Sequence, residues 1–480
     1  MQFLKRHIIT VAIVAITFLV VVTGTMSAVV RYYGWFGAPK PTPHVTTTRH
    51  SGNSLPLPDG QDWAQYRFDL SGTGMNPEGY ISAKNVTQLT EQWTINPHLA
   101  FGSTPAIVNG VVYVPAGNSL FALDLITGER IWQFNGAPQT RGIISSSVAV
   151  DPGAHLAYYG TPDAHVYAVN TLTGTGVWNV QLGNPEAGAY IWSSPLLVNG
   201  KVYIGLASRN DNPCVRGGVF ALDAATGKIA WMHYMVGAGA LGGSVWSSLI
   251  ANPGAHEVIA TTGNPCLSSQ SDEQQDSFVA MDWDTGTTHW QYTALEHDDC
   301  DCDFGQGPVD YTYHGQEYLV AGNKGGVVYA VTPLPGRHSV QLAWSLKIAK
   351  PGFLGYGGIF QPPTYSDGKV FIAGGPTPDG SCKQGALYAL QADTGKVLWH
   401  LCTLGQVLSP TSTTGDVLFV EQGGVLIAYE SATGRELWRA EQHSDFWGGV
   451  SISRGYVLIG SVSGTLYSYY FPEMPKHLPS

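Results

Sequence analysis

The chain has 480 residues, a formal net charge of −11 and only 12% charged residues, together with 59 glycines and 29 prolines. Soluble domains carry about 25% charged residues on average, so this chain has roughly half the usual charge and an excess of turn formers. Its 44% hydrophobic residues, with 14 tryptophans and 24 tyrosines, are enough for a large folded core. The acidity argues against a nucleic-acid partner, whose phosphates need a surface rich in Lys and Arg.

The first predicted element is a transmembrane anchor or signal sequence. Residues 1–7 carry Lys5 and Arg6, and residues 8–30 follow without a formal charge. That stretch is long enough to span a bilayer and exceeds the usual hydrophobic region of a cleaved signal. Small residues at 25–28 leave cleavage open as the alternative. We expect a single-pass anchor in the cell membrane with the rest of the chain on the extracytoplasmic side, because the basic flank stays cytoplasmic.

Residues 31–60 are rich in Pro and Thr and are predicted to form an extended linker. Six cysteines follow this linker. An even number of cysteines in an oxidising compartment permits three disulfides, with 15 possible pairings. Cys382 and Cys402 flank a segment the size of one hairpin and are the pair that we expect first. No C-x-x-C-H motif is present, so no covalent haem is expected.

An internal repeat predicts the fold of the exported part. The segment from Phe121 to Trp132, with the pattern Ala-Leu-Asp-x-x-Thr-Gly before its final Trp, recurs along the chain. One degenerate copy has Pro335-Gly336 in place of Thr-Gly. The copies end at Trp132, Trp178, Trp231, Trp290, Trp344, Trp399 and Trp438.

Each copy of the repeat predicts two strands joined by a turn. Alternation in segments such as 219–222 indicates a half-buried strand. Asp-x-x-Thr-Gly then reverses the chain, because Gly adopts positive φ while Asp and Thr bond to the local backbone. Two further short strands, such as 194–198 and 201–205, precede most copies. Four strands in each repeating unit of roughly 40–60 residues are typical of a β-propeller.

The two ends of this region supply one more unit. Residues 446–472 contain three expected strands but no final Trp, whereas segment 88–95 contains a single strand with Trp93. Pairing the two completes a blade and removes an open sheet edge. We therefore predict an all-β, eight-bladed β-propeller over residues 61–472, closed by strand 88–95 and followed by a tail at 473–480.

The repeat resembles that of pyrroloquinoline quinone (PQQ) dehydrogenases and related propellers. The segment from Asp62 to Trp93 also resembles the start of the catalytic domain of quinoprotein alcohol dehydrogenases. The resemblance covers roughly residues 61–472. Non-catalytic propellers share this repeat, including the lipoprotein that helps to assemble outer-membrane proteins, so function has to be read from the site.

Four separate segments resemble parts of the family's active site. Trp246, in Gly-Gly-Ser-Val-Trp-Ser-Ser, matches the Trp that lies flat under the quinone, and Asn264, in Thr-Gly-Asn-Pro, matches the Asn that binds the metal. Asp301 matches the catalytic base, and Asp303 matches the extra carboxylate of lanthanide-using members. Lys324 matches the Lys or Arg that contacts the quinone oxygens. The resemblance implies PQQ as cofactor, Ca²⁺ or a lanthanide as metal, and Asp301 and Lys324 as catalytic residues, with Asp301 also on the metal.

The residues themselves point to a cation at one of these segments. Residues 298–303 contain four Asp residues. Like charges this close repel and raise one another's pKa unless a cation is present, and a hard cation with oxygen ligands removes the conflict. A solvated acidic loop, or a calcium loop of another kind, is the alternative. Taken alone, Trp246 is also compatible with packing between blades, and Asn264 with a tight turn.

The sequence departs from the family at two places. The family's metal-binding Glu is missing, and Asp211, or less strongly Asn212, stands where it is expected. The stretch that begins at Arg141 lacks the adjacent cysteines that stack over the quinone in many members, and Arg141 is our candidate cofactor contact there. Cys214 and Cys266 follow Asn212 and Asn264 by two residues, so a disulfide between them would hold both loops. The pattern around Cys214 looks like the polyvinyl alcohol dehydrogenase branch.

Two main functions from different classes remain open, with a third beside them. The first is a membrane-anchored, exported quinoprotein oxidoreductase that oxidises a small-molecule or polymeric alcohol. Because no haem domain is expected, its electrons would pass to a separate cytochrome or a membrane quinone. The alternative is a non-catalytic PQQ-like propeller that serves as a scaffold or binding protein of the cell envelope. A metal-stabilised propeller that binds another polar ligand is a third reading.

Overall fold

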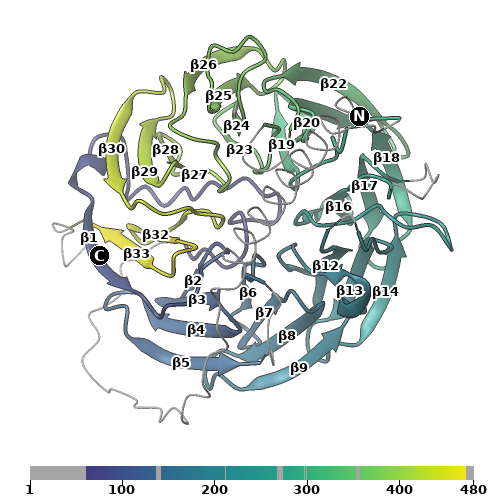
Figure 1. Cartoon of the computed structure of the whole chain (residues 1–480), viewed down its shortest axis with the longest axis horizontal. Coiled ribbons are helices and arrows are strands. Elements are labelled where there is room, and N and C mark those ends of the chain that lie inside the picture. Colours follow the sequence, from purple (N-terminus) through teal and green to yellow (C-terminus); the bar gives the residue numbers. More distant parts are fainter. Residues whose placement is uncertain are drawn as a thin grey trace, which may run out of the picture. The chain divides into compact units, whose positions relative to one another are not determined.

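The computed structural model describes residues 61–136, 142–210, 212–266, 274–296, 298, 300–352 and 357–471. These residues belong to the second of two units into which the chain divides, residues 48–480. They form eight antiparallel sheets of four strands, one of them with an additional short strand, arranged as blades around a central axis (Figure 1). The predicted eight-bladed, all-β propeller is therefore confirmed.

The predicted anchor at 8–30, the linker at 31–60 and the tail at 473–480 lie outside the described residues. Among the residues that are described, none belongs to a helix with the length and hydrophobicity needed to cross a membrane.

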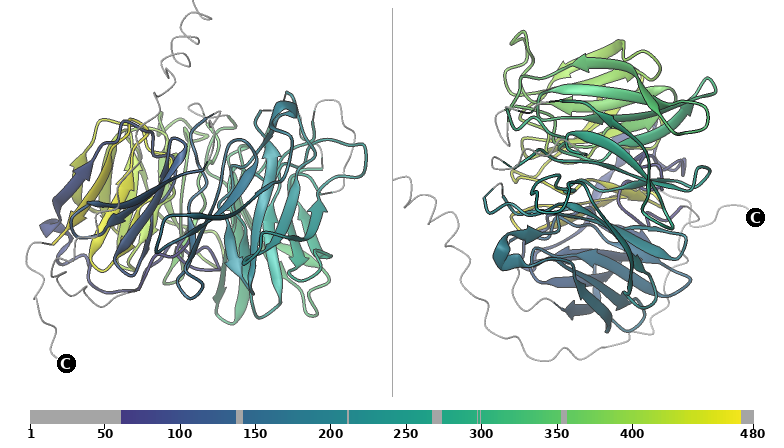
Figure 2. Two further views of the ribbon diagram at one scale, coloured as in Figure 1. Left: turned by 90° about the horizontal axis from the view of Figure 1, so that it is seen from below. Right: turned by 90° about the vertical axis from the view of Figure 1, so that its right-hand side faces the viewer.

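Each blade consists of strands that run between the two faces of the ring, and the strands are consecutive in the chain in every blade but the eighth (Figure 2). Blades 1 to 3 contain β2 (Ala106–Val108), β3 (Val111–Ala116), β4 (Ser119–Asp124) and β5 (Arg130–Asn135); β6 (Ala149–Asp151), β7 (Leu156–Gly160), β8 (His165–Asn170) and β9 (Gly176–Gln181); and β10 (Ala189–Tyr190), β11 (Leu196–Val198), β12 (Lys201–Ser208), β13 (Gly218–Asp223) and β14 (Ile229–Tyr234). Blades 4 to 6 contain β15 (Ile250–Asn252), β16 (Glu257–Thr261), β17 (Ser277–Asp282) and β18 (Thr288–Thr293); β19 (Val309–Tyr313), β20 (Gln316–Gly322), β21 (Val327–Pro333) and β22 (Val340–Lys347); and β23 (Thr364–Ser366), β24 (Lys369–Gly374), β25 (Ala386–Gln391) and β26 (Val397–Cys402). Blades 7 and 8 contain β27 (Ser412–Thr413), β28 (Val417–Gln422), β29 (Val425–Glu430) and β30 (Glu436–Glu441), and β31 (Ser451–Ser453), β32 (Tyr456–Gly460), β33 (Leu466–Tyr470) and β1 (Thr90–Ile95). Two short 3₁₀ helices lie at Val86–Gln88 and Pro185–Ala187.

The ring closes where the sequence predicts. β1, from the N-terminal end of the propeller, pairs antiparallel with β33, with Trp93 opposite Ser468. Figure 1 shows the purple β1 beside the yellow β33. The Trp438 indole N–H of blade 7 donates to the Leu89 carbonyl at 3.0 Å, so the preceding blade also docks on this N-terminal segment. Closure pairs the outer edge of β33 and joins the two ends of the domain.

The repeated Trp residues join neighbouring blades. The Trp132 indole N–H donates to the Thr171 carbonyl of blade 2 at 2.8 Å, and its ring lies against Gly174, whose positive φ the turn requires. Each repeat Trp also lies opposite a small Ala in its own sheet, as Trp132 lies opposite Ala122. Trp290 is the exception among the described residues, because its indole nitrogen lacks a hydrogen-bond partner. The next blade carries the degenerate Pro335-Gly336 turn.

Apolar side chains fill the space between blades rather than a single central core. One cluster joins blades 1 and 2 and includes the buried Trp132 and the stacked pair Tyr159 and Tyr167. Similar clusters occupy other blade interfaces. Burial of this surface supplies the main stabilisation, at about 25 cal/mol per Å² of apolar area.

The segment 61–76 lies inside the ring, a feature that the sequence did not indicate. Its backbone exchanges hydrogen bonds with the innermost strands of several blades, among them Ala251 with Leu70, Asp310 with Ser71 and Thr413 with Gly74. The buried Arg67 donates to the Pro363 carbonyl at 2.8 Å and to the Thr364 hydroxyl at 2.7 Å. This segment therefore holds blades together from within.

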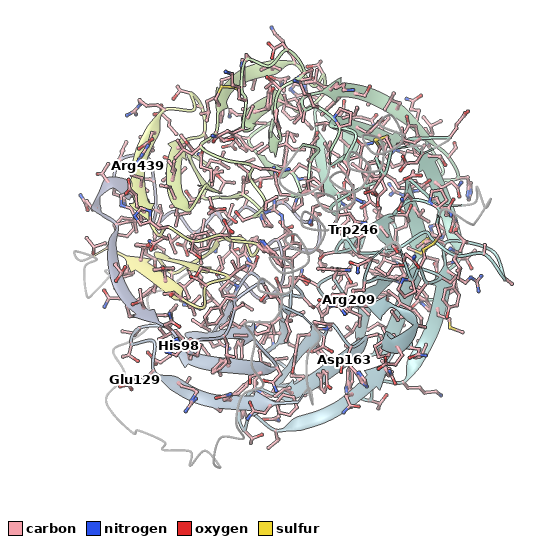
Figure 3. All side chains as sticks on the ribbon, viewed as in Figure 1. His98, Glu129, Asp163, Arg209, Trp246 and Arg439 are labelled. Carbon is pink, nitrogen blue, oxygen red and sulfur yellow. A yellow bond between two sulfur atoms is a disulfide. The ribbon has the colours of Figure 1, made fainter. Side chains whose placement is uncertain are left out.

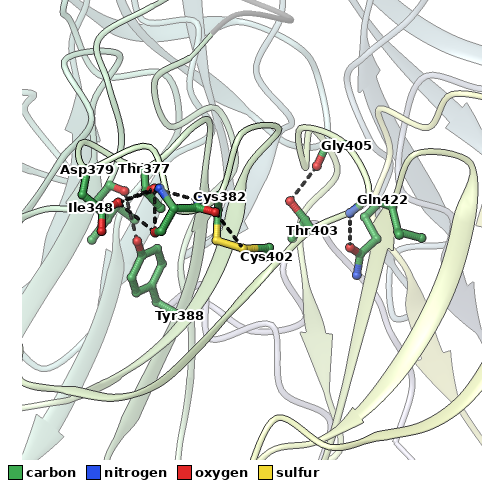
Figure 4. The surroundings of a disulfide bond; sticks show 11 residues. Ile348, Thr377, Asp379, Cys382, Tyr388, Cys402, Thr403, Gly405 and Gln422 are labelled. Atoms are coloured by element: carbon green, nitrogen blue, oxygen red, sulfur yellow. Dashed lines mark hydrogen bonds between the residues drawn. A yellow bond between two sulfur atoms is a disulfide. The ribbon is translucent and has the colours of Figure 1, made fainter.

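Three disulfides are present in the described residues. The predicted Cys382–Cys402 pair ties the loop before β25 to the end of β26 (Figure 4). The predicted Cys214–Cys266 pair joins a loop of blade 3 to a loop of blade 4. Cys300 and Cys302 form the third, a pairing that the sequence left open.

Candidate active site

The matched segments meet at one face of blades 4 and 5. We call the face at which the innermost strand of each blade begins the front face. Trp246 precedes the innermost strand β15, and Asp303 precedes the innermost strand β19. Asn264 and Lys324 follow β16 and β20, which return the chain to the front face. Figure 3 shows Trp246 on the inner side of its blade, near the centre of the ring.

Three of the predicted residues contact one another. The Trp246 indole N–H donates to Oδ2 of Asp303 at 3.0 Å. The ammonium of Lys324 lies 2.5 Å from Oδ1 of the same carboxylate and 5.0 Å from the centre of the Trp246 ring. A backbone hydrogen bond from Lys324 to Asp303, at 2.9 Å, fixes the two segments side by side. The ring, the carboxylate and the ammonium therefore form one unit.

Asp301 joins this unit through Lys324. Its Oδ1 accepts from the Lys324 ammonium at 2.6 Å, and its side chain remains 39% exposed. Its backbone is left-handed, with φ of 53°, and it stands between the two cysteines of the Cys300–Cys302 disulfide. The exposed carboxylate is thus held by a short covalent ring and points to Lys324.

Asp298 builds the loop that presents Asp301. Its carboxylate accepts from the backbone N–H of Cys300 at 2.9 Å and from that of Cys302 at 2.7 Å. Asp298, Cys300 and Cys302 have ligand atoms close enough to hold a metal ion. Both sulfurs are consumed by the disulfide, so we assign this group to the loop rather than to a metal site.

The segment that carries Asn264 passes beside the Asp303 carboxylate. A Cβ atom added to its neighbour Gly263 would stand 3.0 Å from Oδ2 of Asp303, so the backbone before Asn264 passes directly along that carboxylate. The Asn264 carbonyl accepts from the N–H of Gly243 at 3.1 Å. The Cys214–Cys266 disulfide holds the end of this segment. The backbone of Asn264 is therefore held at the edge of the site, and its role as a metal ligand stays a prediction.

Asp276 is an acidic residue of this region that the sequence analysis did not single out. It is buried, directly precedes β17, and its N–H donates to the Gly263 carbonyl. Burial first, and then the charge of Asp303, raise the pKa of Asp276 to about 8. The sequence signal that could have identified Asp276 is its position in the repeat, where no other blade has an acidic residue. The residue directly before the third strand of the other blades is Asn118, Ala164, Gly217, Gly326, Gly385, Gly424 or Thr465.

Burial and the neighbouring charges act in opposite directions on the pKa values of Asp303 and Lys324. Burial raises the pKa of Asp303 to about 6, although the nearby Lys324 ammonium lowers it. Burial alone would lower the pKa of Lys324, but the carboxylates of Asp303 and Asp301 outweigh it and raise that pKa above its usual value. Lys324 is therefore a fixed positive charge, while the carboxylates around it are short of positive partners.

Two predicted site residues, Arg141 and Asp211, lie outside the described residues, as do His297 and Asp299. The roles assigned to Arg141 and Asp211 stay predictions.

Another aromatic residue is described at the front face. Trp447 precedes β31 of blade 8 much as Trp246 precedes β15 of blade 4, and it is 39% exposed. In a ring of eight blades these two stand on opposite sides of the axis.

The side chains present fit a hard cation and a flat, polar ligand. Carboxylate and amide oxygens, as in Asp303, Asp276 and Asn264, are the donors that Ca²⁺ prefers. An orphaned carboxylate oxygen on Asp276 adds to the demand for positive charge. The Trp246 ring offers a flat surface, and the Lys324 ammonium lies above its plane to meet oxygens on a ligand.

Comparisons with known proteins identify the family of the chain. The chain matches the family model of the glucose, ethanol and alcohol dehydrogenase β-propeller domain over residues 63–338, more than half its length. A second model, of the outer membrane protein assembly factor BamB, matches residues 324–467.

Individual relatives are distant. The quinoprotein alcohol dehydrogenase PedH of Pseudomonas putida is 23% identical, over 83% of this chain and 78% of that protein. A polyvinylalcohol dehydrogenase of Pseudomonas sp. is 23% identical, over 80% of this chain and 68% of that protein. The solved structure of a europium-containing methanol dehydrogenase has a TM-score of 0.71 at 19% identity, over 85% of this chain and 98% of that chain. At this identity the structural likeness shows a shared fold.

Proposed function

We propose, from the premise that this chain belongs to the glucose, ethanol and alcohol dehydrogenase β-propeller family, that it is a quinoprotein oxidoreductase that oxidises alcohols. One observation carries the proposal. Trp246, Asp301, Asp303 and Lys324 come from three separate segments of blades 4 and 5 and contact one another at the front face. Structural packing alone does not require a partly exposed Asp paired with a largely buried Lys beside a Trp ring.

The proposed cofactors are PQQ and a Ca²⁺ or lanthanide ion. When bound, the quinone would supply the two-electron acceptor and the ion the Lewis acidity. Trp246 would support the flat ring, and Arg141 is a further predicted contact. Asn264, Asp303, Asp301 and, by prediction, Asp211 would hold the ion.

Asp301 is the residue placed to take the hydroxyl proton of the alcohol. Its carboxylate is the exposed one of the two that pair with Lys324, so a substrate can reach it. Lys324 keeps its charge and would stabilise negative charge that develops on the ligand beside it. Asp303 is buried and held by two donors, which suits a metal ligand better than a base.

The proposal also covers the cellular location of the protein, its electron acceptor and its substrate. A membrane anchor at residues 8–30 would hold the propeller at the extracytoplasmic side of the cell membrane. Three disulfides in the described residues support export, because an oxidising compartment preserves them. Electrons would pass to a cytochrome or a membrane quinone. Relatives named for alcohols and for polyvinyl alcohol support a small or a polymeric alcohol as substrate.

The proposal is tested by dye reduction with the purified full chain, PQQ, Ca²⁺ or a lanthanide, and a panel of alcohols. Asp301→Asn should reduce kcat on the order of 10²–10⁴-fold, because it removes the general base. Asp284→Asn is the matched control, since it breaks the Asp284–Lys201 pair, 2.7 Å long, at the other end of blade 4. Absence of cofactor absorbance and of activity with every metal would overturn the proposal.

A non-catalytic scaffold of the cell envelope is the second candidate. The match of residues 324–467 to the assembly factor BamB supports it. This region includes blades 6 and 7 but leaves Trp246, Asp301 and Asp303 outside. If the chain binds envelope proteins while the dye assay fails with every metal, the scaffold replaces the oxidoreductase.

A further inference from the structure

Asp276 is a buried carboxylate that the proposed mechanism does not use. Its residue is 3% exposed, and within the described part of the chain its Oδ1 has no hydrogen-bond partner. The amide nitrogen of the adjacent Gln275, also buried, lacks a partner there as well. A buried carboxylate without a partner is costly to ionise, so its charged form needs something else that neutralises it.

The position of Asp276 places it next to the proposed metal ligands. Its backbone N–H donates to the Gly263 carbonyl at 3.3 Å. Gly263 in turn lies against the Asp303 carboxylate, and Asn264 is the next residue along the chain. Three neighbouring segments therefore lie side by side, two of which carry the buried carboxylates of Asp276 and Asp303, while the third carries Asn264.

The partners of the surrounding carboxylates differ. Asp298 accepts backbone N–H groups, Asp301 accepts the Lys324 ammonium, and Asp303 is held by Lys324 and Trp246. Asp276 interacts electrostatically with all three of these carboxylates and with Lys324. Oδ1 of Asp276 and Oδ1 of Asp303 both lack a hydrogen-bond donor in the described residues, but Oδ1 of Asp303 has the Lys324 ammonium beside it, whereas no ion pair is found for Asp276 there. The group as a whole contains four carboxylates for the one ammonium of Lys324.

We infer that Asp276 is a direct ligand of the metal ion and adds a carboxylate to a site that lacks the Glu of the family. The inference rests on the proposed function, because it concerns the same ion. Hard cations prefer several carboxylate oxygens, and Asp276 supplies one from the residue directly before β17. The ion in turn satisfies Oδ1 and balances the excess negative charge.

Asp276→Asn is a suitable test because it preserves shape and backbone. Asp276 has φ of 48°, and Asn adopts this left-handed region as readily as Asp. Asp310→Asn is the matched control, since Asp310 is equally buried in blade 5 but is bonded to Asn252 at 3.0 Å, away from Lys324. Thermal unfolding of both variants without metal checks that they fold.

Terbium ions provide a readout that does not depend on activity. Trp246 donates to Asp303, so a bound Tb³⁺ would lie close to an indole and show luminescence on tryptophan excitation. We expect the full chain to bind Tb³⁺ and to release it to excess Ca²⁺ or La³⁺. Asp276→Asn should bind at least about tenfold more weakly, and Asp310→Asn like the unchanged chain. Luminescence lifetimes in H₂O and D₂O should show more coordinated water in Asp276→Asn.

Two results would overturn the inference. One is that Asp276→Asn binds Tb³⁺ with unchanged affinity and with an unchanged number of coordinated water molecules. The other is equal loss in Asp276→Asn and Asp310→Asn, which would mean a general effect of removing a buried acid. Either result leaves the oxidoreductase intact if PQQ-dependent activity persists. Absence of Tb³⁺ binding to the unchanged chain would contradict the metal in the proposed function together with this inference.

Discussion

Two clusters of charged side chains lie at the junction of blades 4 and 5, and they are built differently. The front cluster contains Asp276, Asp298, Asp301, Asp303 and Lys324. The back cluster contains Asn252, Glu257, Asp310, Glu317 and Arg337. It lies toward the opposite face, where the innermost strand β15 ends and β16 begins. Both clusters bury carboxylates, and each contains one positively charged side chain, Lys324 in the front cluster and Arg337 in the back cluster.

The back cluster gives its carboxylates complete partners. Arg337 contacts both oxygens of Glu257, whose side chain is fully buried, and one oxygen of Glu317 at 2.5 Å. Asn252 donates to Asp310 at 3.0 Å and to Glu317 at 3.1 Å. These residues stand on strands or tight turns. The front cluster stands on longer loops and leaves Oδ1 of Asp276 without a donor in the described residues.

This difference separates a structural network from a binding site. A buried charge with all its partners in the same chain is complete and needs nothing from outside. A cluster of buried carboxylates that lacks such partners is destabilised by desolvation until a cation binds to it. The predictions below use removal of one residue at a time to tell the two situations apart.

The largest effect is expected from Arg337→Met in the back cluster. It leaves Glu257 buried without its main partner, so the free energy of unfolding should fall by about 3–5 kcal/mol, measured by urea denaturation. Arg439→Met removes an exposed pair with Glu436, 2.6 Å long, and should cost less than about 1 kcal/mol. Equal effects of the two changes would contradict the structural role of the back cluster.

Lys324→Met in the front cluster should destabilise less, by about 2 kcal/mol without metal, because Asp301 is half-exposed and water can solvate it. Its distinctive consequence is rescue. Ca²⁺ or a lanthanide should restore more stability to Lys324→Met than to Arg337→Met, since, within the described residues, the front cluster has buried carboxylate oxygens without a hydrogen-bond donor and the back cluster has none. Thermal unfolding with and without metal measures this, and equal rescue of both variants would remove the distinction.

The double change Cys300→Ser with Cys302→Ser tests the loop on which the front cluster depends. Loss of this small covalent ring should lower stability by about 1–2 kcal/mol. Asp301 would lose its fixed position, so kcat should fall about tenfold or more while the substrate KM changes little. Cys382→Ser with Cys402→Ser, in blade 6, should lower stability at least as much and leave kcat unchanged. A similar kcat in both double variants would show that the ring does not position Asp301.

Much of the framework could be predicted because short, continuous sequence motifs determine its turns and strands. The Asp-x-x-Thr-Gly turns and the Trp that follows each of them identified the blades, and segment 88–95 closes the ring as β1 at Thr90–Ile95. Trp246, Asp303 and Lys324 were also assigned to one site and are in contact. Their assignment came from motif resemblance, in which each motif is short and continuous.

Other features had no local signal. Nothing in segment 61–76 shows that it lies inside the ring, because its partners are inner strands far along the chain. Asp276 reads as an ordinary polar residue before a strand, and its importance comes from Gly263 and Asp303 beside it. The Cys300–Cys302 pair was one of many possible pairings until the loop geometry was known.

The amino-acid sequence by itself determined the number of blades, their strand order and the types of residue available for chemistry, since turn conformation and strand alternation depend on neighbours along the chain. Only the tertiary structure decided which acids are buried, which of them have partners and where positive charge is missing. Burial and charge balance depend on groups that are distant in sequence and close in space, so no single segment contains that information.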